Sequence, residues 1–200
     1  MAEAVPQRRA TALTFGRFPI ITHGHLAYWR TILERWDTLV LGMLDVEEIR
    51  PYKPGVDVVS REFYDEIVRK CGPRRNPFTA DERRRILRGG LEEAGLQERV
   101  RIDLCPIPEL HPAVISERYP AADVDIVTGD LTDPFERMKI RELETILGRP
   151  IANVQSGFVL HTTDAKHRIL GGDKWSTFVP AGAYEVFVEI GGPARLPADS

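Results

Sequence analysis

The stretch TALTFGRFPIITHGHLAYWRTILERWDTLVLGML, residues 11–44, decides the fold class of this chain. It begins with a short apolar run over residues 11–15, which Gly16 ends, and it closes with a continuous apolar run over residues 38–44. A continuous run of this kind is typical of a strand buried on both faces of a sheet. Between the two runs, apolar side chains recur at helical spacing at Leu26, Trp29, Ile32 and Leu33. The spacing predicts a helix over residues 25–35, and hence a strand–helix–strand unit of a parallel sheet.

The alternation of strands and helices continues along the chain. We expect further helices over residues 60–70, 79–94, 134–147, 163–170 and 183–190, and further strands over residues 100–104, 124–128 and within 151–160. The helix at Thr79 has the sequence of a capping box, with Glu82 three positions on. The pattern predicts an α/β fold with one Rossmann-like parallel sheet flanked by helices, in a single domain over residues 11–195. Residues 1–10 are expected to be a disordered lead-in, and residues 193–200 a frayed tail.

Composition narrows the classes of function. A length of 200 residues fits one domain, and 42% apolar residues are enough for its core. The formal net charge of -3 argues against a nucleic-acid partner. The two cysteines, Cys71 and Cys105, form neither a disulfide framework nor a zinc pattern, which favours reduced thiols in a cytoplasmic protein. We expect no membrane partner, because no apolar run reaches spanning length and residues 1–10 lack the core of a signal peptide.

The loop after the first strand carries the clearest candidate for chemistry. Ligands of parallel α/β sheets bind beyond the carboxyl ends of the strands, and a helix N-terminus favours phosphate. Thr22 and His25 can donate hydrogen bonds to phosphate oxygens there. Gly24 allows close approach of the backbone, and Arg17 adds a fixed positive charge. Neither a dinucleotide fingerprint nor a P-loop is present. The residues alone leave a second interpretation open, in which the two histidines of the loop only cap a helix.

Two motifs carry a resemblance to a known family. GRF at residues 16–18, followed by TxGH at residues 22–25, resembles the signature of the HxGH nucleotidyltransferase superfamily, whose members have His or Thr at its first position. NPFTADER at residues 76–83 is similar to the NPFTAxER segment of archaeal-type nicotinamide mononucleotide adenylyltransferases. The resemblance continues through PIPEL at residues 106–110 and VDIVTG at residues 124–129, and it covers most of the domain. It implies transfer of a nucleoside monophosphate from a triphosphate to a small anionic acceptor, with release of pyrophosphate.

The resemblance also implies roles for individual residues. The catalytic residues are expected to be Thr22, His25 and Lys166. Nucleotide binding is expected from Gly16, Arg17, Phe18, Gly24, Thr128, Gly129, His161, Thr163 and Arg168. Acceptor binding is expected from Lys53, Arg75, Asn76 and Ser116. Mg²⁺ is the implied cofactor; phosphate oxygens and water would hold most of its coordination sphere, so we expect no protein ligand to it. Relatives of this kind often form homo-oligomers, which favours one here.

Three departures from the family pattern bear on the acceptor. The family has a Trp that stacks on nicotinamide in the loop after residues 106–108, and Ser116 occupies that position here. Residues 45–75, after the second strand, are longer than the family's loop, which we interpret as an insertion that could cover a compact acceptor. The family's last motif falls on residues 161–175 of this sequence. There Lys166 replaces an Arg and His161 replaces a Ser, so the charge survives but the planar bidentate fork does not. The insertion is rich in basic residues, namely Arg50, Lys53, Arg61, Arg69, Lys70, Arg74 and Arg75.

These departures favour an enzyme that uses a nucleotide base or an acceptor different from those of the adenylyltransferases. The phosphonoformate cytidylyltransferases of phosphinothricin biosynthesis are similar to the adenylyltransferase family, and they join CMP to a small, strongly anionic phosphonate. We therefore expect transfer from CTP to phosphonoformate, in the biosynthesis of a phosphonate antibiotic. The first alternative is an adenylyltransferase that makes NAD from ATP and nicotinamide mononucleotide. A nucleotide-binding regulator without activity is a weaker alternative, favoured only by the altered last motif, and a Rossmann dehydrogenase is weaker still.

Overall fold

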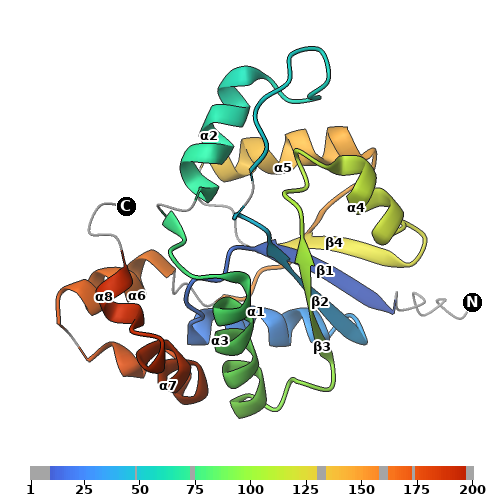
Figure 1. The fold of residues 1–200 in the computed structure, drawn as a ribbon. Coiled ribbons are helices and arrows are strands. Elements are labelled where there is room, and N and C mark those ends of the chain that lie inside the picture. The colour runs from blue at the N-terminus through green and yellow to red at the C-terminus, as the bar shows by residue number, and fades with distance from the viewer. Residues whose placement is uncertain are drawn as a thin grey trace, which may run out of the picture.

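A computed structural model describes residues 10–47, 49–72, 75–129, 134–157, 162–172 and 174–196, without the side chains of residues 135, 162–164 and 175. Its centre is a five-stranded sheet of order β3-β2-β1-β4-β5 (Figure 1). The strands are β1 Thr11–Gly16, β2 Thr38–Leu44, β3 Val100–Cys105, β4 Val124–Thr128 and β5 Ala152–Asn153. Every strand pair in the sheet is parallel, as the alternating pattern predicted. The strand order reverses between β1 and β4, which is the switch point where such sheets bind ligands.

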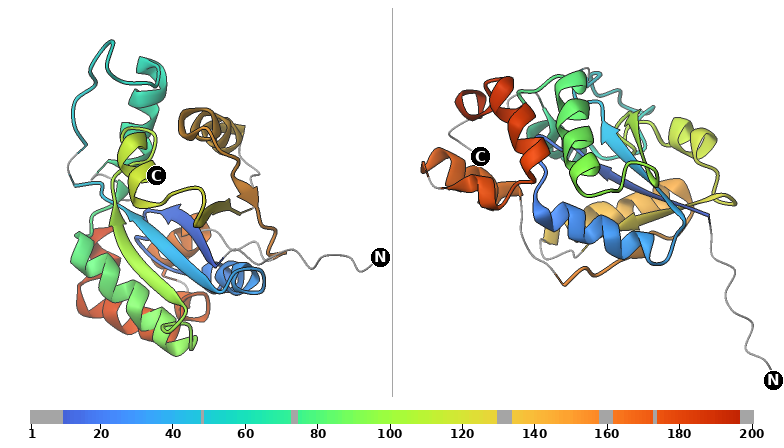
Figure 2. Two further views of the ribbon diagram at one scale, coloured as in Figure 1. Left: turned by 90° about the vertical axis from the view of Figure 1, so that its right-hand side faces the viewer. Right: turned by 90° about the horizontal axis from the view of Figure 1, so that it is seen from below.

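Helices cover both faces of the sheet. Their bounds are α1 His23–Leu33, α2 Arg61–Cys71, α3 Ala80–Glu93, α4 Pro112–Arg118, α5 Pro134–Leu147, α6 Thr162–Leu170, η2 Trp175–Thr177, α7 Ala181–Glu189 and α8 Gly192–Arg195. Successive residues of a strand face opposite sides of a sheet. Ala12 and Leu41 therefore pack in one core with α1, α3 and α7, while Leu13 and Val40 pack in another with α4 and α5. Figure 2 (left) shows the same two layers, with α1 and α3 on one side of the sheet and α4 and α5 on the other.

Helix α2 lies over the carboxyl ends of β2 and β3 rather than over a face of the sheet (Figure 1). Its residues Phe63, Tyr64 and Ile67 pack against Leu44 at the end of β2 and Ile107 after β3, in a third apolar cluster. The segment expected as an insertion therefore has its own core contacts beside the strand ends. That it is an insertion relative to the family remains a prediction.

Helices α3 and α7 touch through their backbones. A Cβ atom at Gly89 would lie 2.4 Å from the carbonyl oxygen of Gly182, and one at Gly182 would lie 2.4 Å from the carbonyl oxygen of Gly89. Real Cβ atoms do not approach backbone so closely, so each position requires glycine. The contact fixes the start of α7 against α3.

The expected frayed tail is wrong as far as residue 196. Arg195 of α8 donates hydrogen bonds from Nη1 to Glu82 Oε1 at 2.5 Å and from Nη2 to the carbonyl oxygen of Pro77 at 2.6 Å. Its guanidinium also lies 4.9 Å from the centre of the Phe78 ring, and Leu196 is buried. A guanidinium that satisfies a carboxylate, a carbonyl and an aromatic face at once holds this segment on α3.

Other differences from the expected elements are small. Helix α4 is absent from the prediction because Pro112–Arg118 is too short for a helical period to stand out. Helix α1 begins two residues earlier than expected, and β5 has only two residues. The predicted capping box of α3 is confirmed, with Glu82 N donating to Thr79 Oγ1 at 3.2 Å and Thr79 N donating to Glu82 Oε2 at 2.8 Å.

Acid is expected to destabilise the fold through Glu82. The hydrogen bond from Arg195 lowers the pKa of this carboxyl from an ordinary 4.5 to about 2. A depressed folded-state pKa gives stability that is complete above the unfolded pKa and is lost as the pH falls toward the folded one. The free energy of unfolding should therefore fall between pH 4.5 and pH 2, and Glu82→Gln should flatten part of that fall in urea titrations at each pH. Asp81→Asn is the matched control because its side chain is 87% exposed. A full wild-type slope in Glu82→Gln would contradict the assignment.

Candidate active site

The loop between β1 and α1 places the first predicted motif at the switch point of the sheet. Strand β1 ends at Gly16, and Thr22 is the N-cap of α1 with an extended backbone at φ -123°. The hydroxyl oxygen of Thr22 accepts from the backbone N–H of His25 at 3.4 Å, and the Thr22 side chain is fully buried. Because the first N–H groups of a helix lack partners within the helix, a cap of this kind fixes where the helix begins.

The imidazole of His25 completes the cap and is oriented by it. Its Nδ1 lies 3.0 Å from the backbone nitrogen of Thr22, which donates to it, and 3.0 Å from the Thr22 hydroxyl oxygen. In a neutral imidazole one nitrogen accepts and the other carries the proton. Acceptance at Nδ1 therefore places the proton of the neutral ring on Nε2. Capping and ligand binding are thus compatible, since the cap uses one nitrogen and leaves the other as a donor.

Phe18 packs against this histidine in a strained conformation. Its φ of 49° is the one positive value among the described residues other than glycine. Backbone strain of this kind often gathers at functional sites. The Phe18 ring lies 6.1 Å from the His25 ring and 5.8 Å from the Trp29 ring, centre to centre. A Cβ atom at Gly16 would lie 2.4 Å from the Phe18 ring, so only glycine lets the ring fold back over the end of β1.

Helix α6, which carries the last predicted motif, reaches the N-terminus of α1 through Phe178. The carbonyl oxygen of Phe178 accepts from the backbone N–H of His23 at 3.0 Å. The guanidinium of Arg168 lies 4.3 Å from the centre of the Phe178 ring. Lys166 is buried on the same helix, with 8% of its surface exposed. Arg168 thus contacts the residue that bonds to the first turn of α1, and Lys166 lies two positions earlier on the same helix. His161 and the side chain of Thr163 lie outside the described residues.

A buried arginine lies beneath the loop, and the sequence analysis did not assign it to the site. Arg83 of α3 is fully buried, and its Nη1 donates to the carbonyl oxygen of Arg17 at 2.9 Å and to that of Leu44 at 2.8 Å. Burial lowers the pKa of its guanidinium, while Glu47 and Asp45 oppose the shift. The residue stands in the NPFTADER segment, so the signal was present in the sequence, but the motif does not say what an arginine there contacts.

A cavity of about 220 Å³ opens at the carboxyl ends of β1 and β2. Its charged lining residues are Arg17, Lys70, Glu109, Glu136 and Lys139. A smaller cavity of about 80 Å³ shares Glu109, Glu136 and Lys139 with it, and Thr128 at the end of β4 lines this second cavity. The site therefore has two parts, the helix end with His25 and a mixed-charge cavity next to Gly16 and Arg17.

Glu109 and Lys139 form an ion pair in this cavity. Lys139 Nζ lies 3.4 Å from Glu109 Oε1, and the Glu109 side chain has 0% of its surface exposed. Neither carboxylate oxygen of Glu109 has a hydrogen-bond partner among the described residues. Burial lowers the pKa of Lys139, but the negative charges of Glu109 and Glu136 outweigh it, and the pKa is raised overall. Burial raises the pKa of the Cys71 thiol at the cavity wall. The sequence analysis missed this pair because its members lie 30 positions apart and no periodic pattern links them.

The residues predicted to bind the acceptor do not come together as a group. Asn76 is buried at 4% exposure, and neither atom of its side-chain amide has a hydrogen-bond partner within the described chain. Arg75 is half-buried in the turn before it. Lys53 instead lies in an exposed turn, where its backbone N–H donates to Asp57 Oδ2 at 2.6 Å. Ser116 is exposed on α4 and lines neither cavity.

Most basic side chains of residues 45–75 are held by carboxylates nearby. Ion pairs join Arg50 to Asp57, Arg61 to Asp65 and Arg69 to Glu66. Lys70 does line the cavity, and its carbonyl oxygen accepts from Arg17 Nη1. Lys70 also lies within ion-pair distance of Glu66, with Nζ 3.8 Å from Oε1, so the surplus of cations around an acceptor is smaller in the described part of the chain than the sequence suggested.

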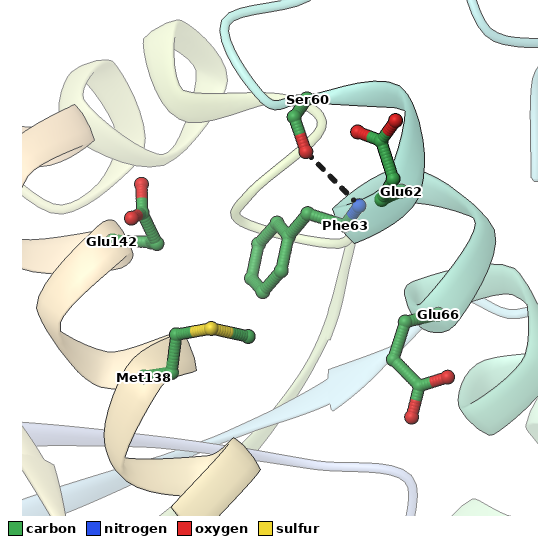
Figure 3. A pocket seen from close by; sticks show the side chains of 6 residues that line it. All are labelled: Ser60, Glu62, Phe63, Glu66, Met138 and Glu142. Carbon is green, nitrogen blue, oxygen red and sulfur yellow. Dashed lines mark hydrogen bonds between the residues drawn. The ribbon is translucent and has the colours of Figure 1, made fainter.

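A separate hollow of about 310 Å³ lies between α2 and α5 (Figure 3). Phe63 and Met138 face one another across it, and its rim carries Glu62, Glu66 and Glu142. Its lining has three carboxylates and no cation, which does not favour a phosphate-bearing ligand. Within the described residues, no group of three His, Cys, Asp or Glu side chains is arranged to hold a metal ion. Nor does any helix described here have the length and apolarity needed to cross a membrane.

Comparison with known proteins agrees with this architecture. A bifunctional NMN adenylyltransferase/ADP ribose pyrophosphatase from Francisella tularensis, complexed with AMP and a manganese ion, superposes with a TM-score of 0.62 at 15% identity. The match covers 96% of this chain and 52% of that one, so the chain spans about half the length of that protein. A Vibrio parahaemolyticus protein, named as a nicotinate-nucleotide adenylyltransferase, gives a TM-score of 0.55 at 16% identity, covering 92% of this chain and 95% of the other. At sequence identities of 15% and 16%, structural similarity of this kind shows a shared fold.

Sequence relatives give the family. No protein-family model matches the sequence. The phosphonoformate cytidylyltransferase of Streptomyces viridochromogenes is 30% identical over 199 residues, covering 96% of this chain and 98% of that protein. The nicotinamide-nucleotide adenylyltransferase of Thermococcus kodakarensis is 25% identical over 189 residues, covering 92% and 85%. Fold, loop and relatives together define a nucleotidyltransferase. The chain belongs to the family that contains phosphonoformate cytidylyltransferase and the archaeal nicotinamide-nucleotide adenylyltransferases.

Proposed function

We propose that this nucleotidyltransferase transfers CMP from CTP to a small phosphonate acceptor and releases pyrophosphate. The observation that carries the proposal is the Thr22–His25 cap, which presents a fixed imidazole donor at the N-terminus of α1 beside the end of β1. An acceptor oxygen would attack the α-phosphorus in line. Catalysis would then consist of positioning and charge stabilisation, without a covalent enzyme intermediate. The relative at 30% identity, named for phosphonoformate and a cytidylyl group, supports the choice of base and of acceptor class.

Each of the two parts of the site would bind one of the two substrates. His25 and Thr22, with Lys166 and Arg168 on α6, would bind the triphosphate. Arg17, expected from the resemblance to bind nucleotide, lines the cavity with Lys70 and Lys139, a position that favours contact with the acceptor. A volume of about 220 Å³ is below the range usual for larger ligands, which suits a compact acceptor.

Mg²⁺, when bound, would supply positive charge against the negative charge that develops on the leaving pyrophosphate. Such an ion takes most of its ligands from substrate oxygens and water. The residues of this chain would act on the phosphates directly, through Lys166 and the α1 N-terminus.

Adenylyl transfer from ATP to nicotinamide mononucleotide is the second candidate. The archaeal adenylyltransferases favour it, because the Thermococcus onnurineus protein matches 92% of this chain at 24% identity. Against it stands the absence of a Trp between Trp36 and Trp175, since the family stacks nicotinamide on one in that region. Pyrophosphate release, measured for four triphosphates against phosphonoformate and nicotinamide mononucleotide with Mg²⁺, separates the candidates. Binding of a triphosphate without release in any combination would instead support an inactive regulator.

Lys166→Ala is expected to weaken use of the triphosphate more than use of the acceptor. The residue is buried on the helix beside the α1 N-terminus, where a cation stabilises a polyphosphate. We expect KM for CTP to rise by about tenfold, as for one charge-assisted hydrogen bond, with KM for the acceptor nearly unchanged. Lys174→Ala, at an exposed position after the same helix, is the control. Unchanged triphosphate kinetics would remove Lys166 from the nucleotide site.

A further inference from the structure

The loop from Lys53 to Val58, just before α2, presents two apolar side chains to solvent. Val56 and Val58 are 70% and 64% exposed, the highest values among the large apolar residues of the described chain. Between them, the Asp57 side chain is turned inward, where it is 1% exposed. It accepts from the guanidinium of Arg50 and from the backbone N–H of Lys53 at 2.6 Å, which holds the loop in this conformation. Figure 1 shows the loop projecting from the body of the molecule beside the start of α2.

The hollow between α2 and α5 is complementary to this loop in shape and in charge (Figure 3). Phe63 and Met138 give it an apolar lining within a volume of about 310 Å³. Two of its three carboxylates, Glu62 and Glu142, belong to no ion pair within the described chain. The loop carries the opposite charge, because Lys53 is exposed and likewise belongs to none of the ion pairs that the structure describes. A projecting apolar group next to a cation therefore matches an apolar hollow edged by anions.

The loop leaves the hollow of its own chain open. Ser60, the N-cap of α2, lines the hollow, so loop and hollow lie next to each other at one end of this helix. Val56 and Val58 nevertheless do not line it, and they stay exposed. In a dimer with two-fold symmetry, a surface patch meets the same patch of the other copy. A projection and a matching hollow within one patch can then pair with each other twice.

We infer that two copies of this chain associate through this face, with the valines of each loop in the hollow of the other copy. Each Lys53 would lie beside the other copy's Glu62 and Glu142. The apolar contact would supply affinity, and the charges would set the register. The inference goes beyond the proposed function and does not depend on it. Helices α2 and α5 also line the cavity at the strand ends, through Lys70 and Lys139, so association would hold two walls of that cavity in place.

Substitution of the valines tests the apolar contact. Sedimentation velocity of the wild-type chain over a wide range of concentrations should show a monomer–dimer equilibrium. Val56→Asp/Val58→Asp should raise the dimer Kd by about 100-fold or more, because it places carboxylates of each loop in an acidic hollow. Val188→Asp, at a position on α7 that is 46% exposed, is the matched control and should leave Kd unchanged, with melting curves to check that each variant is folded. A wild-type chain that stays monomeric, or a dimer that persists in the double variant, would overturn the inference.

Charge reversal tests the register of the contact. Lys53→Glu and Glu142→Lys should each raise Kd by about tenfold, because like charges then face one another across the dimer. An equimolar mixture of these two variants should associate as tightly as the wild type, since each loop again meets a hollow of opposite charge. Glu92→Lys, exposed on α3, should neither weaken the dimer nor rescue Lys53→Glu. Absence of rescue in the mixture would overturn the inference. Burial of the loop on addition of substrates to a chain that stays monomeric would also overturn it and would assign the valines to closure over the site.

Discussion

Replacing His25 with alanine is expected to lower kcat by about 100- to 1,000-fold with little change in thermal stability. The substitution removes the Nε2–H donor at the N-terminus of α1, where the proposed function has charge develop on the phosphates. Loss of one such preorganised donor has this magnitude in other enzymes. The helix keeps its N-cap, because the Thr22 hydroxyl still accepts from the backbone N–H of residue 25. Steady-state pyrophosphate release and a melting curve measure the two parts of the prediction.

The neighbouring histidine provides the matched control. His23 stands in the same helical turn, but it is anchored through its backbone, whose N–H donates to the carbonyl oxygen of Phe178. His23→Ala should therefore keep most of the turnover. A folded His25→Ala enzyme with wild-type kcat would exclude His25 as a catalytic residue, and an equal loss in both variants would indicate damage to the helix rather than loss of a donor.

The fold could be predicted in detail where a pattern in the sequence has one structural solution. Strand β4 and helix α5 have their expected bounds, because residues 124–128 are a short segment rich in β-branched residues that Gly129 follows, and residues 134–147 keep a helical period for almost four turns. Strand β5 is shorter than expected because its pairing with β4 extends over only two positions, which no local pattern records. Tertiary contacts also determine the structure of the C-terminal segment, which packs on α3 through Arg195 although its sequence predicts a frayed tail.

The site was predictable only in the part that lies in one loop. Thr22 and His25 are three positions apart, so sequence spacing alone places them together. The cavity is assembled from residues of separate elements, such as Arg17 after β1 and Lys139 on α5, and the sheet topology brings them together. The ungapped alignment gave Ser116 as an acceptor contact, and that role stays a prediction. Ser116 falls on the exposed side of α4, while Glu109, seven positions earlier, lines the cavity.

Arg83→Ala is expected to lower the free energy of unfolding by about 3 kcal/mol and to lower turnover as well. The guanidinium is fully buried and donates to the carbonyl oxygens of Arg17 and Leu44, and each such charge-assisted bond contributes about 1.5–3 kcal/mol. Relief of the buried charge offsets part of the loss, since burial already lowers the pKa of this guanidinium. For a domain of this size the melting temperature should fall by roughly 6–12 °C.

The loss of turnover should exceed what the unfolded fraction explains, because Arg83 supports the geometry of the loop. Its bond to the Arg17 carbonyl fixes the peptide that leads into Phe18, whose φ of 49° persists only where its surroundings determine it. Released from that bond, Phe18 can relax, and its ring no longer needs to pack against His25. Arg84→Ala, one position on, removes a surface ion pair with Asp81 and should change stability by less than about 0.5 kcal/mol. Equal melting temperatures for the two variants would contradict the role of Arg83. If Arg83→Ala loses stability yet keeps the wild-type kcat at low temperature, that outcome would show that Arg83 acts only in packing and that the conformation of Phe18 does not affect turnover.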